Sequence, residues 1–233
     1  MSTIMYLAKF FEIDEHADQF VRGNIYCNTL RKFKKMEDKR FPGRADSDEG
    51  TTRWLQPDEV DIQIAGVRVT GLAGPVQVQM NWLNDVHVFC MVAGHTGTLD
   101  VQYFSTEDLR QELIIPRGCL DLGQHLVMVT DVTEFINRMD AAVQETDYRY
   151  AHGLVKYYDP ETFHGEFRNM EAVFRKQDHY SYQREFRFAF ETGRMDNHPL
   201  TIEIGDISDI TARMSSSDLL NDGYVQVIPA QRD

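Results

Sequence analysis

Apolar and polar residues alternate in many short runs along the chain, which is the pattern of half-buried β-strands. The first run covers residues 4–11 and the second covers residues 24–29. Residues 60–71 form two alternating segments around Ala65-Gly66, which predicts a hairpin. Further strands are predicted at residues 76–80, 86–92, 125–131, 153–158, 180–191, 201–206 and 224–228.

Apolar residues spaced three or four positions apart predict four helices. They lie at residues 12–23, 30–38, 105–114 and 131–145, and the last two open with Ser105/Asp108 and Asp131/Glu134 pairs typical of helix caps. Strands outnumber helices and do not alternate with them one by one, which argues against a doubly wound parallel sheet. We therefore predict a single α+β domain over residues 1–233. Its sheet should be mostly antiparallel and strongly twisted, or split into two small sheets, with several short helices on its flanks.

Charge and cysteine content indicate which cellular compartment and which classes of partner to expect. The net charge is −13 and the sequence pI is near 5.0, which disfavours general affinity for nucleic acid phosphates. Basic residues are dense only from Arg31 to Arg44, which fits either a solvated helix face and loop or a local site for a phosphate-bearing ligand. Three cysteines, far apart and odd in number, indicate a reducing compartment. Without a signal peptide pattern or a membrane-spanning apolar stretch, we expect a cytoplasmic protein with no membrane partner.

The segment from Tyr180 to Phe190 carries the strongest candidate for chemistry. Strand alternation directs its phenylalanines at 186, 188 and 190 into the core, and it brings Glu185 and Arg187 together on the opposite face. One interpretation is a plain surface ion pair. The other is a pocket wall on which Glu185 accepts a hydrogen bond from a sugar hydroxyl and stabilises positive charge on the adjacent ribose carbon.

Two earlier segments supply further candidates. The polar stretch at residues 38–52 is expected to be a surface loop, in which Arg44 and the nearby Arg53 would clamp a pyrophosphate with their guanidinium groups or would form ion pairs within the loop. Tyr26 and Asn28 share one face of the second strand and point to a ligand or to a turn.

Several common catalytic patterns are absent from the sequence. The eight histidines show no HxH or HExxH spacing, so no metal is expected. The acidic loop lacks the twelfth-position Glu of a calcium loop, because Pro57 stands there. No GxSxG, P-loop or GxGxxG motif is present, which removes serine hydrolases, kinases and Rossmann enzymes from consideration.

The order of these motifs resembles a prokaryotic family of uncharacterised proteins found near phage-defence and mobile elements. The likeness is carried by Gly23-Asn-Ile-Tyr26 with Phe33, by Val88-Phe-Cys90 and by the YxxExR strand Tyr182-Gln-Arg-Glu185-Phe-Arg187. The family's Asn-Asp-Pro after the second strand is replaced here by the Arg44–Gly50 loop.

The same order is similar to the ADP-ribosyltransferase superfamily, and especially to its DNA-modifying toxin branch. That resemblance implies NAD as substrate, Glu185 as the catalytic glutamate and Arg44, or failing it Arg53, as the early arginine. Tyr26 and Asn28 would line the nicotinamide side, and Tyr26, Tyr180 or Tyr182 would stack on the ring. Lys9 stands where the superfamily usually has a histidine or arginine.

Three hypotheses follow from these observations. The first is an NAD-consuming ADP-ribosyltransferase or NAD glycohydrolase acting as a toxin or as a phage-defence or counter-defence effector. Its protein or nucleic-acid acceptor is left open. The second is a non-enzymatic acidic inhibitor or sensor that docks on a basic partner. The third is a metal-independent ribonuclease toxin that uses His179 and Arg187.

Overall fold

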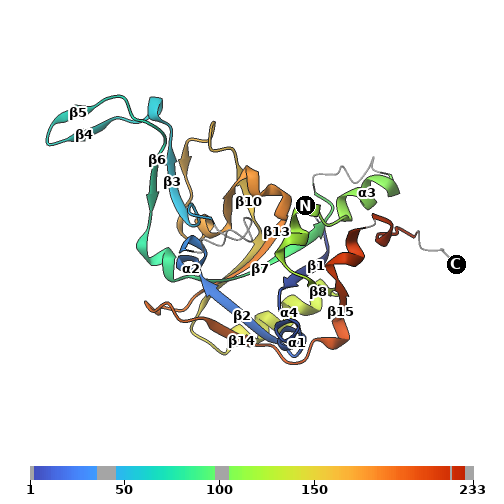
Figure 1. The fold of residues 1–233 in the computed structure, drawn as a ribbon. Helices are drawn as coiled ribbons and strands as arrows, with labels where there is room; N and C mark the ends of the chain where they lie inside the picture. Colours follow the sequence, from blue (N-terminus) through green and yellow to red (C-terminus); the bar gives the residue numbers. More distant parts are fainter. Residues whose placement is uncertain (1–2, 36–45, 98–104, 221, 229–233) are drawn as a thin grey trace.

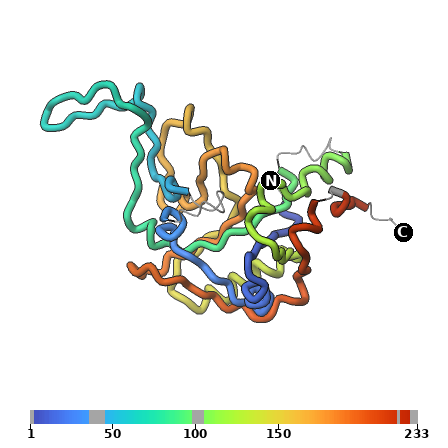
Figure 2. The backbone as a smooth tube through the Cα atoms, in the orientation of Figure 1, coloured from blue at the N-terminus to red at the C-terminus, as the bar shows by residue number. Residues whose placement is uncertain are grey.

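A computed structural model describes residues 3–35, 46–97, 105–220 and 222–228 of the chain (Figures 1 and 2). Its centre is an eight-stranded sheet in which every pairing is antiparallel. In spatial order, six of its strands are β14 (Leu200–Glu203), β2 (Asn24–Thr29), β7 (His87–His95), β1 (Ile4–Phe11), β8 (His125–Val129) and β15 (Thr211–Ser215). On its other edge β7 pairs with β13 (Glu185–Glu191), which in turn pairs with β9 (Arg149–Leu154).

Three small sheets lie beside the main one. The first is antiparallel, in the order β11 (Gly165–Glu166), β3 (Thr51–Leu55) and β6 (Val76–Gln79). The second pairs β10 (Lys156–Tyr158) in parallel with β12 (Arg175–Gln177). The third is the hairpin of β4 (Ile62–Ile64) and β5 (Val67–Val69), which projects from the body of the molecule in Figure 1.

The helices are short. The α-helices are α1 (Asp14–Val21), α2 (Leu30–Lys35), α3 (Thr106–Leu113) and α4 (Val132–Gln144). Short 3-10 helices are η1 (Pro57–Glu59), η2 (Asn81–Asp85), η3 (Arg117–Leu122), η4 (Asn169–Phe174), η5 (Asp178–Gln183), η6 (Ser208–Ile210), η7 (Ser216–Leu220) and η8 (Asp222–Tyr224). The predicted caps are formed: Ser105 and Asp108 make a reciprocal capping box, and Asp131 accepts the amide of Glu134.

The α+β prediction with a mostly antiparallel sheet is therefore confirmed, while several local predictions were wrong. The strand predicted at residues 153–158 is divided between β9 of the main sheet and β10 of a small sheet. Thr51 and Thr52 belong to β3 and not to a loop: Thr51 pairs with Gln79 of β6, and Thr52 lies at the irregularity between Thr51 and Arg53. Residues 180–183 form a 3-10 turn, so β13 begins only at Glu185. Residues 225–228 are not a strand, and the edge of the main sheet is instead occupied by β15, whose polar sequence gave no strand signal.

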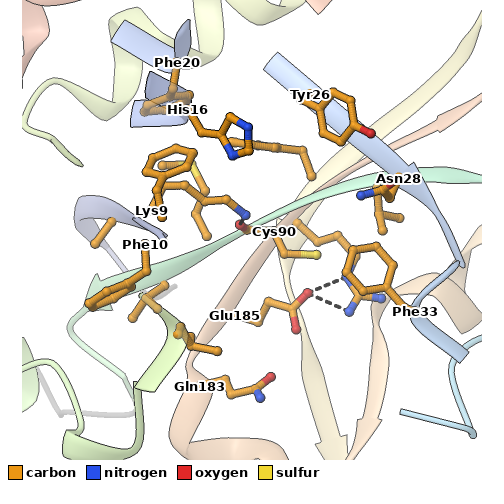
Figure 3. Close-up of a pocket in the computed structure, with 18 of the residues that line it drawn as sticks. Lys9, Phe10, His16, Phe20, Tyr26, Asn28, Phe33, Cys90, Gln183 and Glu185 are labelled. Atoms are coloured by element: carbon orange, nitrogen blue, oxygen red, sulfur yellow. Dashed lines mark hydrogen bonds and ion pairs between the residues drawn. The ribbon is translucent and has the colours of Figure 1, made fainter. Parts of the chain in front are cut away.

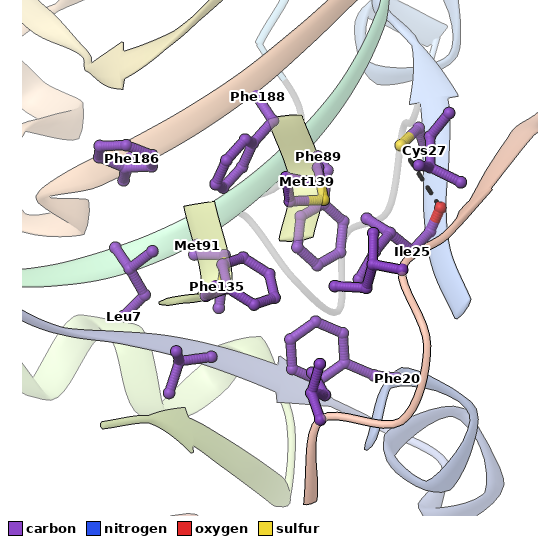
Figure 4. Packing of buried hydrophobic residues seen from close by; sticks show 14 of the residues in the cluster. Leu7, Phe20, Ile25, Cys27, Phe89, Met91, Phe135, Met139, Phe186 and Phe188 are labelled. Atoms are coloured by element: carbon purple, nitrogen blue, oxygen red, sulfur yellow. Dashed lines mark hydrogen bonds between the residues drawn. The ribbon is translucent and has the colours of Figure 1, made fainter. Parts of the chain in front are cut away.

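The largest apolar cluster lies between the main sheet and helices α1 and α4 (Figure 4). Phe20 from α1 and Phe135 from α4 meet Phe89 and Phe188 from the sheet, with ring centroids 5.6 to 6.5 Å apart. All four are at most 3% exposed. Strand alternation then directs the neighbouring residues of β7 and β13 to the opposite face, where polar groups gather.

This packing predicts how far the free energy of unfolding falls when a buried aromatic ring is removed. We expect Phe188→Ala to lower the free energy of unfolding by about 3–5 kcal/mol, because a fully buried ring leaves a cavity among aromatic neighbours. Urea unfolding followed by circular dichroism measures the change. Met195→Ala, at a residue that is 87% exposed, is the control and should alter stability by less than about 0.5 kcal/mol. Equal stability of the two variants would contradict the placement of Phe188.

Candidate functional site

A fork in the main sheet, where two neighbouring strands diverge, creates a cavity. Strands β1 and β2 both pair with the same edge of β7: β2 with Val88 and His87, and β1 with Val92 and the residues after it. In this register neither strand pairs with residues 89–91 on that edge. A cavity of about 560 Å³ occupies the fork, lined by residues of β1, β2, β7 and β13. This volume is typical of a small-molecule site.

Lys9 of β1 fills part of the gap in the strand pairing. Its Nζ donates a hydrogen bond of 2.6 Å to the carbonyl oxygen of Cys90, and it lies 4.6 Å from the centroid of the Phe89 ring. A buried carbonyl without a partner would be costly, so the ammonium group replaces a strand at this point. The fork is thereby held open next to the cavity.

Glu185 is the central acid of the cavity wall (Figure 3). It is 4% exposed, and its Oε1 accepts a hydrogen bond of 2.6 Å from Nε of Arg187. Its Oε2 accepts one of 3.0 Å from Nζ of Lys176. The solvated surface pair is therefore the wrong interpretation of Glu185 and Arg187, because both side chains are buried against the cavity.

Glu49 completes a buried cluster of four charges. Its carboxylate accepts bonds of 2.8 and 3.0 Å from Nη1 and Nη2 of Arg187, and it lies 3.4 Å from Nζ of Lys176. All four side chains are at most 6% exposed. The acidic end of the early loop thus reaches the same site as β13. Two cations and two carboxylates balance one another, which is the condition under which buried charge is tolerated.

Gln183 approaches Glu185 because the chain reverses before β13. Arg184, between them, adopts the left-handed conformation with φ of 42°, which ends the 3-10 helix η5 and starts the strand. Nζ of Lys176 then donates a bond of 3.0 Å to the side-chain oxygen of Gln183. Lys176 therefore fixes an amide and a carboxylate side by side on the cavity wall.

The electrostatics of the cluster keep Glu185 ionised. Burial by itself would raise the pKa of Glu185, but the charges of Arg187 and Lys176 outweigh it and hold that pKa well below its usual range. Burial would lower the pKa of Lys176, yet Glu185 and Glu49 hold it well above its usual range. Burial, with the nearby charge of Glu185, raises the pKa of the Cys90 thiol to about 12, so that thiol stays protonated and unreactive at neutral pH.

The second strand supplies the wall facing this cluster. Tyr26 and Asn28 both line the cavity, whereas Cys27 between them is buried in the core. Tyr26 is 55% exposed, so its ring lies at the mouth, and Phe33 of α2 also lines the cavity (Figure 3). The described cavity wall therefore combines aromatic rings, four side-chain amides and an ionised carboxylate.

The other predicted site residues lie elsewhere. Arg53 does not line the cavity; its side chain is 56% exposed and pairs with Glu166 of β11. Tyr182 packs in a separate apolar cluster next to Gly118, so its ring is not part of the cavity wall. His179 of the ribonuclease hypothesis does not line it either. Arg44 lies outside the described residues.

Three residues of the site had no usable signal in the sequence. Lys176 and Lys9 stand in strands with no accompanying motif, and Glu49 is one of several acids in a polar stretch. Only tertiary contacts distinguish them. Strand alternation, in contrast, correctly put Glu185 with Arg187 on one strand face and Tyr26 with Asn28 on another, and the structure shows that both pairs line one cavity.

Removing one member of the charge cluster should be costly. We expect Arg187→Met to lower the free energy of unfolding by about 3–5 kcal/mol, because two buried carboxylates lose their shared partner. Chemical denaturation at neutral pH gives the difference. Arg194→Met, at an exposed arginine, is the matched control, and a similar loss in both variants would argue against the cluster.

The raised pKa of the buried Asp46 side chain, three residues before Glu49, predicts that the stability of the fold depends on pH. Burial, with the charge of Glu49, raises the pKa of Asp46 from 3.8 to about 7. Between these values the folded chain holds a proton that the unfolded chain releases, so its contribution to the free energy of unfolding falls as pH rises through this window. Asp46→Asn should flatten that fall in denaturant titrations between about pH 4 and 7. The exposed-acid control Asp58→Asn should retain it, and an unchanged slope in Asp46→Asn would contradict this assignment.

Comparison with known proteins does not assign this chain to a family. The chain matches no protein-family model, no curated protein and no solved structure. Within the described residues, no helix combines the length and the apolar character needed to cross a bilayer.

Proposed function

We propose that this protein is an NAD-consuming enzyme of the ADP-ribosyltransferase or NAD glycohydrolase type. The observation that supports the proposal is the position of Glu185, an ionised carboxylate on the wall of a cavity shared with Tyr26 and Asn28. A fixed negative charge beside a ligand-sized space suits a reaction in which positive charge develops on the substrate.

The reaction breaks the bond between C1′ of ribose and the ring nitrogen of nicotinamide. The bonding electron pair leaves with nicotinamide and neutralises its pyridinium charge, while positive charge develops on C1′ and the ring oxygen. Water, or a hydroxyl or amine of an acceptor, then bonds to C1′ and releases a proton. Glu185 would accept a hydrogen bond from the ribose 2′-hydroxyl and stabilise the developing cation, since a preorganised charge in a site of low dielectric acts strongly.

Arg187 and Lys176 serve this role by holding the carboxylate rather than by touching the substrate. Their bonds to opposite oxygens of Glu185 fix its orientation, and a fixed orientation supplies part of a catalytic advantage. Tyr26 and Phe33 offer aromatic faces to a pyridinium ring. The side-chain amide of Asn28 can pair with the nicotinamide carboxamide, which carries a matching donor and acceptor.

A second candidate function is a non-enzymatic acidic binding protein. It is favoured by the fact that both oxygens of Glu185 are already engaged within the protein, as expected of a purely structural ion cluster. This candidate predicts one stoichiometric basic partner whose affinity falls with added salt. It also predicts no ligand in the cavity.

The enzymatic proposal is tested by following nicotinamide release from NAD, with and without cell extract as a source of acceptor. We expect Glu185→Gln to reduce the rate by about 10²–10³ or more, because the charge that stabilises the transition state is lost. Glu203→Gln, at an exposed acid of β14, should retain the wild-type rate.

Glu185→Gln also leaves two buried cations with one fewer partner, so its stability will fall. Tyr26→Ala keeps the test decisive, because Tyr26 is half-exposed and its loss leaves the core intact. It should remain folded and lose about tenfold or more in kcat/KM. Full activity of Glu185→Gln, or no release by the wild type with any acceptor, would refute the proposal.

A further inference from the structure

The charges that line the cavity are balanced, and this restricts what the cavity can bind. Its described wall contains the cations Lys9, Lys176 and Arg187 and the carboxylates Glu12, Glu49 and Glu185. Three positive and three negative charges give a formal sum of zero, with His16 as the remaining ionisable group of basic type. A pocket built for phosphates would show an excess of positive charge and free N–H groups directed at the ligand.

The two deep cations are already committed to carboxylates. Arg187 directs Nε to Glu185 and both terminal nitrogens to Glu49, and Lys176 lies within 3.4 Å of both acids. A phosphate that took either cation would leave a buried carboxylate without its partner. Such an exchange is strongly unfavourable at side chains that are at most 6% exposed.

The third cation has a structural task. Lys9 donates its 2.6 Å hydrogen bond to the Cys90 carbonyl at the gap in strand pairing. If this ammonium group turned toward an anion, the Cys90 carbonyl oxygen would lose the hydrogen bond that Lys9 donates to it. None of the three cations of the described wall is therefore available to a phosphate without a cost elsewhere.

A cationic ring, unlike a phosphate, can bind to this wall without displacing any of its ion pairs. The aromatic faces of Tyr26 and Phe33 attract a pyridinium ion, and Glu185 provides a carboxylate at the wall. Neither interaction breaks an internal ion pair. The described part of the cavity wall therefore suits the riboside end of a dinucleotide better than its pyrophosphate.

We propose that the cavity selects N-ribosylpyridinium cations, of which nicotinamide riboside is the simplest, and that phosphate groups of a larger substrate stay outside it. This inference rests on the proposed function and specifies its substrate class. The reaction with the phosphate-free substrate is a hydrolysis: the C1′–N bond breaks, nicotinamide leaves with the electron pair, water bonds to C1′ and its proton passes to solvent. Ribose and nicotinamide are the products.

The first experiment compares nicotinamide riboside, nicotinamide mononucleotide and NAD as substrates of the wild-type protein. We expect kcat/KM for the riboside either to lie within about threefold of the value for the mononucleotide or to exceed it, since the phosphate contributes no binding in the cavity. A riboside value about tenfold or more below the mononucleotide value would overturn the inference and leave the proposed function intact. No release from any of the three would overturn both.

A binding measurement separates recognition from chemistry. Calorimetric titration with 1-methylnicotinamide, a stable pyridinium cation without a glycosidic bond, should show saturable binding that Tyr26→Ala weakens. Inorganic pyrophosphate should neither bind in the same experiment nor displace the cation. Binding of pyrophosphate in competition with the cation, or no binding of the cation, would overturn the inference.

The charge balance itself can be altered at the mouth. Glu12 is exposed and lines the cavity, so Glu12→Gln adds one unit of positive charge without disturbing the core. We expect the preference for the mononucleotide over the riboside to rise about two- to fivefold at low salt and to return toward the wild-type ratio at high salt. Glu15→Gln on the same segment, outside the cavity wall, is the matched control. An unchanged ratio in Glu12→Gln would count against electrostatic selection.

Discussion

Four buried charges at one edge of β13 hold the candidate site and part of the fold together. Glu185, Arg187, Lys176 and Glu49 come from β13, β12 and the segment before β3, and none of them could be buried singly without a large desolvation cost. Their mutual neutralisation therefore couples the position of the early acidic segment to that of the late strand. A site assembled in this way is rigid, because displacing one member uncovers the others.

The fork between β1 and β2 provides the space beside this cluster. In a sheet of regular pairing, residues 89–91 would be covered by a neighbouring strand and no cavity would exist. Here the strands diverge, and the Lys9 ammonium group satisfies the Cys90 carbonyl that the divergence leaves behind. The aromatic core under α1 and α4 supports the fork from the other face, because Phe89 and Phe188 belong to the same strands as Cys90 and Arg187. Apolar packing on one face of the sheet thus fixes the positions of the polar side chains on the other face.

The electrostatic balance of the cavity links its structure to the reaction proposed for it. A cluster that neutralises itself cannot attract anions, but it can hold one carboxylate ionised and oriented at the wall. A ribosyl cation that develops as neutral nicotinamide leaves would be stabilised by such a carboxylate. In the proposed reaction this arrangement would stabilise the charge that develops on the ribose, and Tyr26 at the mouth would contact the ring that leaves.

Local sequence patterns determined the fold class, most of the strands and the correct face for Glu185, Arg187, Tyr26 and Asn28. These features depend on the alternation of side chains along a strand and on helix caps, both of which act over a few residues. The position of β15, the 3-10 turn at residues 180–183 and the membership of Lys176, Lys9 and Glu49 were decided only by tertiary structure. An edge strand is defined by the neighbour it pairs with, and a buried ion cluster by partners as far as 138 positions apart in the chain. No short-range pattern encodes either, because the energy that selects them arises when distant segments are brought together and water is excluded.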